Sequence, residues 1–292
     1  MRQGIGDDCA VLRSSRQKDI LVTTDLFLEG VHFRRNWQEA AAAGHKALAR
    51  GLSDIAAMGG TPRYAFLSLG LPKNIRQDWV ENFLGGLLEL AQSARVTLAG
   101  GDTGRSSRGL IADIVVVGDV PRNQAVLRCG ARPGDEIWVT GNLGLAGHAL
   151  RCLQQNKKRS ASPEALQAFF YPQPRLRTGR VLRKRKLASA MIDLSDGLSI
   201  DLARLCQASG VGAEIQEAWL PRAASTPLNC ALHGGEDLEL LFTVPVERSR
   251  LVPKQAGGVR LTRIGRIVAR RGLALVQGKK ARPLPVRGFE HF

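Results

Sequence analysis

Met191–Leu198 reads M-I-D-L-S-D-G-L and joins an apolar lead-in to two aspartates, a serine and a glycine. After it, apolar residues recur at helical spacing as far as Ala208, so the pattern predicts the end of a strand, a tight turn and the start of a helix. Asp193, Ser195 and Asp196 would then lie on the turn, where two carboxylates and a hydroxyl can converge on one ligand.

Five other short stretches repeat this combination of an acid with glycine, serine, threonine or a second acid. Each is predicted to place its acids at the end of a strand or helix. A single Gly-Asp turn is weak evidence for function, because Asp and Gly favour turns and Asp also caps helices. The five are Gly6-Asp7-Asp8, Thr23-Thr24-Asp25, Ser53-Asp54, Gly100-Gly101-Asp102 and Gly234-Gly235-Glu236-Asp237.

Acids in such turns suit magnesium and phosphate chemistry. Mg²⁺ prefers hard oxygen ligands and retains water, so a few carboxylates and substrate phosphates usually complete its coordination shell. Several such ions can neutralise a triphosphate and the charge that develops during phosphoryl transfer. Glycine beside the acid allows the backbone to approach the phosphates closely. The six turns are therefore predicted to gather into one metal–phosphate site.

Simpler roles remain open for individual residues. Asp196 could cap the helix that begins at Leu198. Asp54 could be a solvent-facing acid near a helix end, where the helix dipole disfavours it. His32 is either a polar loop residue or a hydrogen-bond partner of a substrate, and Arg128 is either a surface base or a clamp for a phosphate.

Apolar periodicity predicts two α/β halves joined by a junction at 121–133. The first half reads strand, helix, strand, helix, strand, strand. The second half contains the strand–turn–helix unit at 191–208 and the acidic turn at 234–237. Strands are predicted over 20–24, 64–71, 96–99, 110–120, 136–140, 212–215, 238–244 and 261–268, and helices over 39–58, 77–95, 141–153, 163–170 and 174–187.

The composition is that of an ordinary globular protein. With 292 residues the chain is long enough for one large or two medium domains, and 44% hydrophobic and 23% charged residues are typical values. No apolar run approaches the roughly 18 residues of a membrane helix, and no signal segment is present, so no membrane partner is expected. The five scattered cysteines form no C-x-x-C pair, which favours reduced thiols and a cytoplasmic location.

The net charge of +16 favours anionic partners. The bases concentrate at 157–159, 175–186 and 263–287, and Arg183–Lys186 is the densest run. A solvated helix face explains such a run most simply. Contact with nucleic acid is the alternative, but it is disfavoured because no aromatic residues interleave with the bases and no nucleic-acid motif is present.

Several common enzyme motifs are absent from the sequence. There is no G-x-x-x-x-G-K-[ST] loop, no protein-kinase motif set and no G-x-S-x-G, which argues against a P-loop enzyme, a protein kinase and a serine nucleophile. Gly141, Gly144 and Gly147 give G-x-x-G-x-x-G, which lacks the spacing of a dinucleotide-binding loop. A tight turn before a helix explains these glycines better.

Eight collinear segments together resemble the thiamine-monophosphate kinase family, in the superfamily of aminoimidazole-ribonucleotide synthetase and selenophosphate synthetase. The resemblance implies a two-domain PurM-like fold of the α/β (α+β) class. Its N-terminal sheet-forming domain, residues 1–121, would bind ATP and metal and form a homodimer, and a C-terminal α/β domain would follow at 122–292. The segments are G-I-G-D-D-C-A (4–10), T-T-D-L-x-x-E-G-V-H-F (23–33), K-A-L-A-x-x-L-S-D-I-A-A-M-G (46–59), G-G-D-T (100–103), R-C-G-A-R-P-G-D (128–135), I-D-L-S-D-G-L (192–198), G-G-E-D-x-E-L (234–240) and the terminal H-F.

The same resemblance implies transfer of the γ-phosphoryl group of ATP onto thiamine monophosphate, giving thiamine diphosphate, with several Mg²⁺ ions. Asp25, Asp54 and Asp196 would be catalytic. The ATP contacts would be Gly101, Asp102, Arg128 and Ser195, and the contacts to thiamine monophosphate would be His32 and Glu236. The magnesium ligands would be Asp8, Thr23, Thr24, Asp25, Asp54, Asp102, Asp193 and Asp196.

The sequence departs from the family pattern in three places. Family members usually carry a helix before the first motif, so a preceding segment is expected to be missing here. Leu238 stands where the family usually has Tyr, and Val286 where it often has a Trp that packs on thiamine. Phe289 could replace that Trp.

Two other functions stay open. The chain could be another ATP-dependent synthetase of the superfamily, although Cys9 lies inside the ordinary kinase motif and not at a separate reactive position. It could also be a basic nucleic-acid-binding protein on this scaffold, using 175–186. The retention of every acidic turn argues against a scaffold that has lost its metal site.

Overall fold

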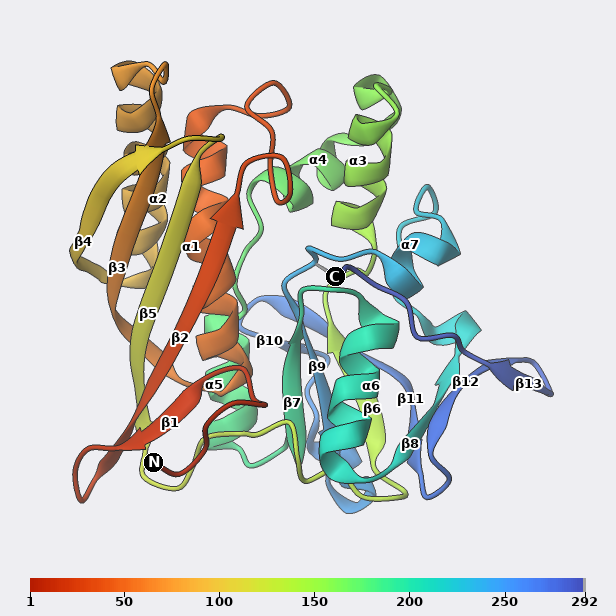
Figure 1. Cartoon of the computed structure of the whole chain (residues 1–292). Coiled ribbons are helices and arrows are strands. Elements are labelled where there is room, and N and C mark those ends of the chain that lie inside the picture. The colour runs from red at the N-terminus through yellow and green to blue at the C-terminus, as the bar shows by residue number, and fades with distance from the viewer. Residues whose placement is uncertain (291–292) are drawn as a thin grey trace.

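The computed structural model describes residues 1–290, and it contains two mixed sheets with helices packed against and between them (Figure 1). The first sheet has the order β1-β2-β5-β3-β4, and only β3 and β4 pair in parallel. Helices α1 and α2 cover one of its faces (Figure 1). The elements are β1 (Ala10–Arg13), β2 (Lys18–Leu28), α1 (Ala40–Ala57), β3 (Thr61–Pro72), α2 (Gln77–Ala94), β4 (Thr97–Ser106) and β5 (Ile111–Pro121).

The second sheet has the order β13-β12-β8-β11-β6-β9-β7, with β10 paired to β11. Helix α6 packs across β7, β8 and β12. Its strands are β6 (Glu136–Thr140), β7 (Ala190–Leu194), β8 (Gly212–Gln216), β9 (Glu239–Val244), β10 (Gln255–Ala256), β11 (Val259–Val268), β12 (Gly272–Gln277) and β13 (Lys280–Pro283). The helices of this half are α3 (Leu145–Gln154), α4 (Pro163–Phe170), α5 (Leu176–Lys184), α6 (Leu198–Ser209) and α7 (Leu228–His233).

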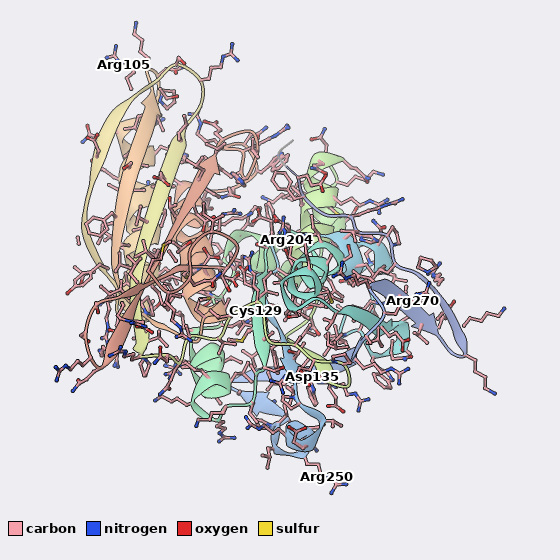
Figure 2. All side chains as sticks on the ribbon, turned by 60° about the horizontal axis from the view of Figure 1, so that its bottom comes forward. Arg105, Cys129, Asp135, Arg204, Arg250 and Arg270 are labelled. Carbon is pink, nitrogen blue, oxygen red and sulfur yellow. The ribbon has the colours of Figure 1, made fainter. Side chains whose placement is uncertain are left out.

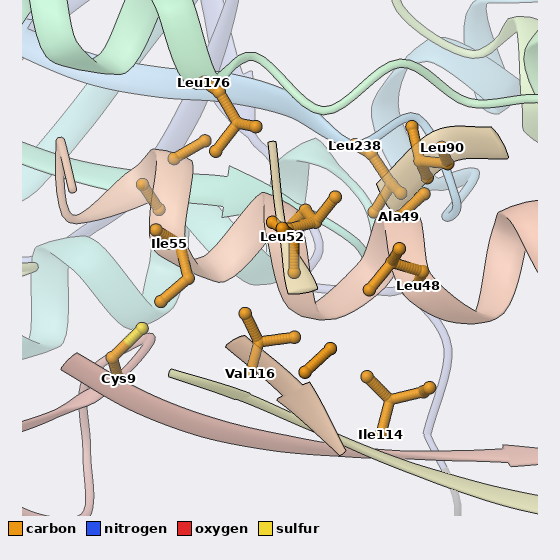
Figure 3. Packing of buried hydrophobic residues seen from close by; sticks show 14 of the residues in the cluster. Cys9, Leu48, Ala49, Leu52, Ile55, Leu90, Ile114, Val116, Leu176 and Leu238 are labelled. Carbon is orange, nitrogen blue, oxygen red and sulfur yellow. The ribbon is translucent and has the colours of Figure 1, made fainter. Parts of the chain in front are cut away.

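Helix α1 lies between the two halves of the molecule and contacts β2, β3 and β5 on one side and α5, β7 and β9 on the other. Leu52 and Ile55 pack towards Val116 of the first sheet, and Leu176 approaches α1 from the second half (Figure 3). Fifteen of its eighteen residues are buried. A helix buried all round must be apolar or carry polar side chains that are paired, so the acids and bases of α1 need partners.

Small residues allow α1 to approach its neighbours closely. A Cβ atom at Gly86 of α2 would lie 2.0 Å from the carbonyl oxygen of Ala41, and one at Gly179 of α5 would lie 2.0 Å from that of Ala56. These distances are far below van der Waals contact, so only glycine fits at either crossing. The backbone of α1 is thereby fixed against both halves of the chain.

The mixed α/β class is confirmed, but several local expectations are wrong. Gly100–Asp102 is not a turn, because β4 continues through it to Ser106 as an exposed edge strand. The helix expected from Gly141 begins at Leu145, since Gly141 and Gly144 have φ of +59° and +79°. The helix α7 and the strands β10, β12 and β13 were not expected at all. The domain boundary between 121 and 122 stays a prediction.

The charge pattern also differs in one place from the expected solvated face. Arg183 is buried, and its guanidinium donates to the carbonyl of Gly59 (2.8 Å) and to Oε1 of Gln124 (2.8 Å). It therefore ties α5 to the end of α1. Other bases do project outwards, as Arg105, Arg250 and Arg270 do at the periphery (Figure 2). Within residues 1–290, none of the helices is both long and apolar enough to cross a membrane.

The α1–α2 crossing gives a test of this packing. Gly86→Ala is expected to lower the free energy of unfolding by about 1–3 kcal/mol, because the added methyl group forces the two backbones apart. Gly85→Ala is the matched control, since a Cβ there meets no atom within 4 Å and removes a helix-weakening glycine. It should stabilise by about 0.5–1 kcal/mol. Chemical denaturation measures both, and equal effects would show that the close crossing is not needed.

Candidate active site

Three carboxylates from distant parts of the chain meet where α1 and β7 end. Asp8 precedes β1, Asp54 lies in the last turn of α1, and Asp193 lies on β7. One oxygen of each lies within 4.8 Å of the others. Asp8 and Asp193 are buried and Asp54 is partly exposed, so the group is open to a ligand on one side only.

Hydrogen bonds orient these carboxylates. Ser53 Oγ donates to Asp193 Oδ2 at 2.7 Å, and the hydroxyl of Thr23 donates to Asp54. Arg128 contacts both oxygens of Asp8, at 3.0 Å from Nη2 and 3.2 Å from Nε. Thr23 therefore contacts another residue of the predicted metal set, whereas Arg128, predicted to contact ATP, pairs with the predicted metal ligand Asp8.

The electrostatics of the group favour a bound cation. Burial raises the pKa of Asp54 well above its usual value, and the charges of Asp25, Asp193 and Asp8 raise it further. Burial and the charge of Asp8 likewise raise the pKa of Asp193. A divalent cation among these oxygens would remove the repulsion and favour the ionised acids. An all-carboxylate set is also the donor type that Mg²⁺ prefers, so the residues fit this ion.

A basic cluster adjoins the acids along α1. Lys46 Nζ lies 2.9 Å from Glu236 Oε2 and 3.5 Å from the ring centre of Phe169, and the lysine is fully buried. Arg50 lies 3.2 Å from Glu236 Oε1 and 3.4 Å from Asp25 Oδ1. Burial alone would raise the pKa of Glu236, but the charges of Lys46 and Arg50 outweigh it and lower this pKa. Glu236 is therefore held as a carboxylate.

Asp196 does not cap the helix after it, so that alternative is wrong. Helix α6 has Gly197 as its N-cap with no side-chain cap bond. The side chain of Asp201 instead accepts from the backbone N–H groups of Asp196 and Gly197, both at 3.1 Å. Arg204 donates to Asp196 at 2.5 Å and to Asp201 at 2.7 Å. Asp196 therefore keeps its side chain near the site, held by an arginine.

His32 and Ser195 also lie near these turns. His32 is buried, its Nδ1 accepts from the backbone N–H of Leu28 at 2.9 Å, and its ring centre lies 6.0 Å from that of Phe289. The carbonyl of Ser195 accepts from the N–H of Glu236 at 2.7 Å. The turn of the opening motif is thereby joined to the Gly-Gly-Glu-Asp turn.

Three predicted residues do not meet the acid cluster within one chain. Thr24 follows Thr23 on a strand and so points to the opposite face, where it donates to Asp113 at 2.8 Å. Gly101 and Asp102 are exposed on β4. That strand is three positions from β2 in the sheet, a separation of about 14 Å. Their roles stay predictions.

Several residues at this site had no role predicted from the sequence. Lys46, Arg50 and Asp54 lie at i, i+4 and i+8, so they share one face of a helix that is otherwise rich in alanine. That spacing was a signal for the basic cluster. Asp201 carried no such signal, because only the folded turn brings its carboxylate to the N–H groups of the preceding residues. The residues missed are Lys46, Arg50, Ser53, Asp201 and Arg204.

Comparison with known proteins defines the class. The family model for the N-terminal domain of AIR synthase related proteins matches residues 6–120, and the model for the C-terminal domain matches residues 132–277. The fold of solved HypE structures is also similar, with a TM-score of 0.80 at 19% identity in a HypE–HypF complex. The two matched regions thus make this chain an AIR synthase related protein.

Nearly full-length relatives narrow the assignment. Thiamine-monophosphate kinase of Escherichia coli K12 is 37% identical over 99% of this chain and 91% of its own length, and that of Bacillus subtilis is 33% identical over 99% and 93%. A structure of AaThiL complexed with AMPPCP and TMP has a TM-score of 0.86 at 34% identity, covering 99% of this chain and 92% of its own. The crystal structure of thiamine-monophosphate kinase from Stenotrophomonas maltophilia has a TM-score of 0.83 at 36% identity, covering 94% and 90%. The chain belongs to the thiamine-monophosphate kinase family.

The acid cluster predicts two effects of Asp54→Asn on the free energy of unfolding, one in the absence of Mg²⁺ and one in its presence. The raised pKa of Asp54 means that folding favours its protonated form, so metal-free stability is lost as pH rises above about 4. Asp54→Asn removes one buried charge and should make metal-free stability depend less on pH above about 4. It should also abolish stabilisation by Mg²⁺, which in the unsubstituted protein reaches about 2.7 kcal/mol at one hundred times Kd.

Thermal unfolding with and without Mg²⁺ at several pH values measures both effects. Asp78→Asn is the control, because Asp78 is an exposed acid at the start of α2 that pairs with Arg76. This variant should respond to Mg²⁺ as the unsubstituted protein does. An undiminished Mg²⁺ response in Asp54→Asn would contradict the assignment of the cluster as the cation site.

Proposed function

We propose that this protein phosphorylates thiamine monophosphate to thiamine diphosphate, using ATP and Mg²⁺. The observation that carries the proposal is the cluster of Asp8, Asp54 and Asp193 in a chain that aligns over 99% of its length with a structure holding AMPPCP and TMP. The high positive charge suits a protein whose substrates are phosphate anions.

The residues divide into a metal side and a substrate side. Asp8, Asp54 and Asp193 would hold Mg²⁺, which supplies charge neutralisation for the triphosphate when bound. Arg128 adjoins Asp8 and would contact a phosphate of ATP once a cation replaces it as the partner of that acid. His32 and Glu236 would face thiamine monophosphate, with Asp25 and Asp196 contributing charge at the reacting groups.

The chemistry needs positioning more than proton transfer. The acceptor is already a phosphate anion, so no strong base has to activate it. Ser53 and Thr23 hold the acids in fixed orientation. Asp25, Asp54 and Asp196 are therefore assigned electrostatic roles.

We also propose a homodimer formed through the uncovered face of the first sheet. Large apolar side chains are exposed on this face: Leu26 is 54% exposed, Tyr64 51%, Phe66 40% and Ile111 38%. Alternation along the strands places Asp102, which pairs with Ser68, on the same face. A second copy packed there would bury the apolar residues. Asp102 is too distant to join the acid cluster of its own chain, and this packing would bring it towards the second copy.

An ATP-dependent assay tests the activity. With Mg²⁺, ATP and thiamine monophosphate, the protein should form thiamine diphosphate and ADP in equal amounts, measured by liquid chromatography. Thiamine without phosphate should not be converted. Asp193→Asn should reduce turnover at least about 100-fold, because a positioned charge in the site is lost. If no thiamine diphosphate forms and the protein instead binds RNA with steep salt dependence, the nucleic-acid alternative is correct.

Light scattering after size exclusion tests the dimer. Phe66→Glu should shift the protein from twice the chain mass to the chain mass, because an unpaired charge would be buried at the interface. Leu251→Glu is the control, since Leu251 is 63% exposed in the second half of the chain. Its mass should not change. A Phe66→Glu variant that keeps the dimer mass would exclude this face.

A further inference from the structure

The charge on the inner face of α1 changes sign along the helix. Lys46 and Arg50 precede Asp54 by two turns and one turn, and each four-residue step advances about 6 Å. The acid cluster therefore lies at one end of this face and the basic cluster at the other. A phosphate group between them would have metal ions on one side and a cationic side chain on the other.

The basic cluster carries one more positive charge than its carboxylate requires. Lys46 is fully buried and lies 2.9 Å from Glu236, so it alone can balance that acid. Arg50 adds a second cation at 3.2 Å from the same carboxylate. Its other acid, Asp25, lies 3.4 Å away. The charge of Asp25 also acts on Asp54 of the acid cluster, so a cation bound there would compete with Arg50 for Asp25.

Arg50 also has unused hydrogen-bonding capacity. Its guanidinium carries five N–H donors, and hydrogen bonds to Glu236 and Asp25 account for two of them. Its Nε is buried and has no partner among the described residues. A buried donor without a partner is costly, and a planar guanidinium is suited to bind a phosphate through two parallel hydrogen bonds. The side chain as a whole is 13% exposed, so part of the guanidinium is open to a ligand while its Nε is covered.

We infer that Arg50 binds the acceptor phosphate of thiamine monophosphate and holds it in line for attack, an assignment that rests on the proposed function. In the reaction, a non-bridging oxygen of this phosphate forms a bond to the γ-phosphorus of ATP. The bond from that phosphorus to the oxygen bridging to the β-phosphate breaks, and ADP leaves with the electron pair. When the acceptor is fully ionised, no proton has to move. Arg50 then balances negative charge that the metal ions do not reach.

A structural role for Arg50 makes a different prediction from a phosphate-binding role. An arginine that only joins Asp25 to Glu236 affects every ligand of the site alike. An arginine that binds the acceptor phosphate affects thiamine monophosphate and leaves thiamine, which has no phosphate, almost unchanged. Comparison of the affinities for thiamine and thiamine monophosphate therefore distinguishes the structural role from the phosphate-binding role.

Calorimetric titration of Arg50→Gln with each ligand, in Mg²⁺ and a non-hydrolysable ATP analogue, gives the test. The affinity for thiamine monophosphate should fall about 10- to 100-fold, as for loss of a charge-assisted hydrogen bond. The affinity for thiamine should change less than about threefold. In turnover, KM for thiamine monophosphate should rise while KM for ATP stays constant. Arg50→Lys keeps the charge but not the paired donors, so its affinity for thiamine monophosphate should lie between those of the unsubstituted protein and Arg50→Gln.

Arg63→Gln is the matched control, because Arg63 makes its ion pair with Asp119 on the surface of the first sheet. It should bind both ligands normally. If Arg50→Gln loses affinity for thiamine and thiamine monophosphate equally, or for neither, the assignment of Arg50 is wrong. The proposed kinase function is not affected by that outcome. If Arg50→Gln does not fold, the same comparison with Arg50→Lys decides. An unsubstituted protein that does not convert thiamine monophosphate would overturn the proposed function itself.

Discussion

Burial of three carboxylates within 4.8 Å of one another is unfavourable, and much of the surrounding structure is arranged around this constraint. Arg128 neutralises Asp8 from one side, and hydroxyl groups from Ser53 and Thr23 bind the other two acids. These partners lower the cost without removing it, since the pKa values of Asp54 and Asp193 stay well above their usual range. Strain of this kind at a binding site is retained when a ligand relieves it.

Helix α1 is what holds the acids at this distance. It carries Asp54 and is packed against both halves of the chain through contacts that admit only glycine at the crossings. Arg183 binds the carbonyl of Gly59 and so fixes the end of the helix where Asp54 lies. The surface arginine run expected from the sequence thus contributes one residue to the support of the site. Displacement of α1 would separate the acids contributed by the first half from Asp193 of the second.

Much of the fold and site could be predicted because acids at the ends of strands and helices converge when those elements pack. Asp8, Asp54 and Asp193 do meet. The extent of a strand within a sheet could not be predicted in the same way. Asp102 sits in a Gly-Gly-Asp sequence that favours a turn, but pairing with β3 continues β4 through it. Hydrogen-bond partners were not predictable either. Asp201 accepts from the N–H groups of Asp196 and Gly197 because the folded turn brings them together, and local propensity does not indicate this.

Two positions, 238 and 286, were predicted from the sequence to depart from the aromatic pattern of the family. Leu238 has φ of +48° and is fully buried in the core, so its side chain serves packing and not the site. Val286 is 52% exposed and lines a cavity beside α6, away from His32. The segment after it continues to Phe289, whose N–H donates to the carbonyl of Asp196 at 3.1 Å and whose ring lies near His32. This anchoring places an aromatic ring from the end of the chain beside both a predicted metal ligand and a predicted substrate contact. The replacement of the family's Trp by Phe289 stays a prediction, and it requires the C-terminal segment to dock onto the turn at Asp196 as it does here.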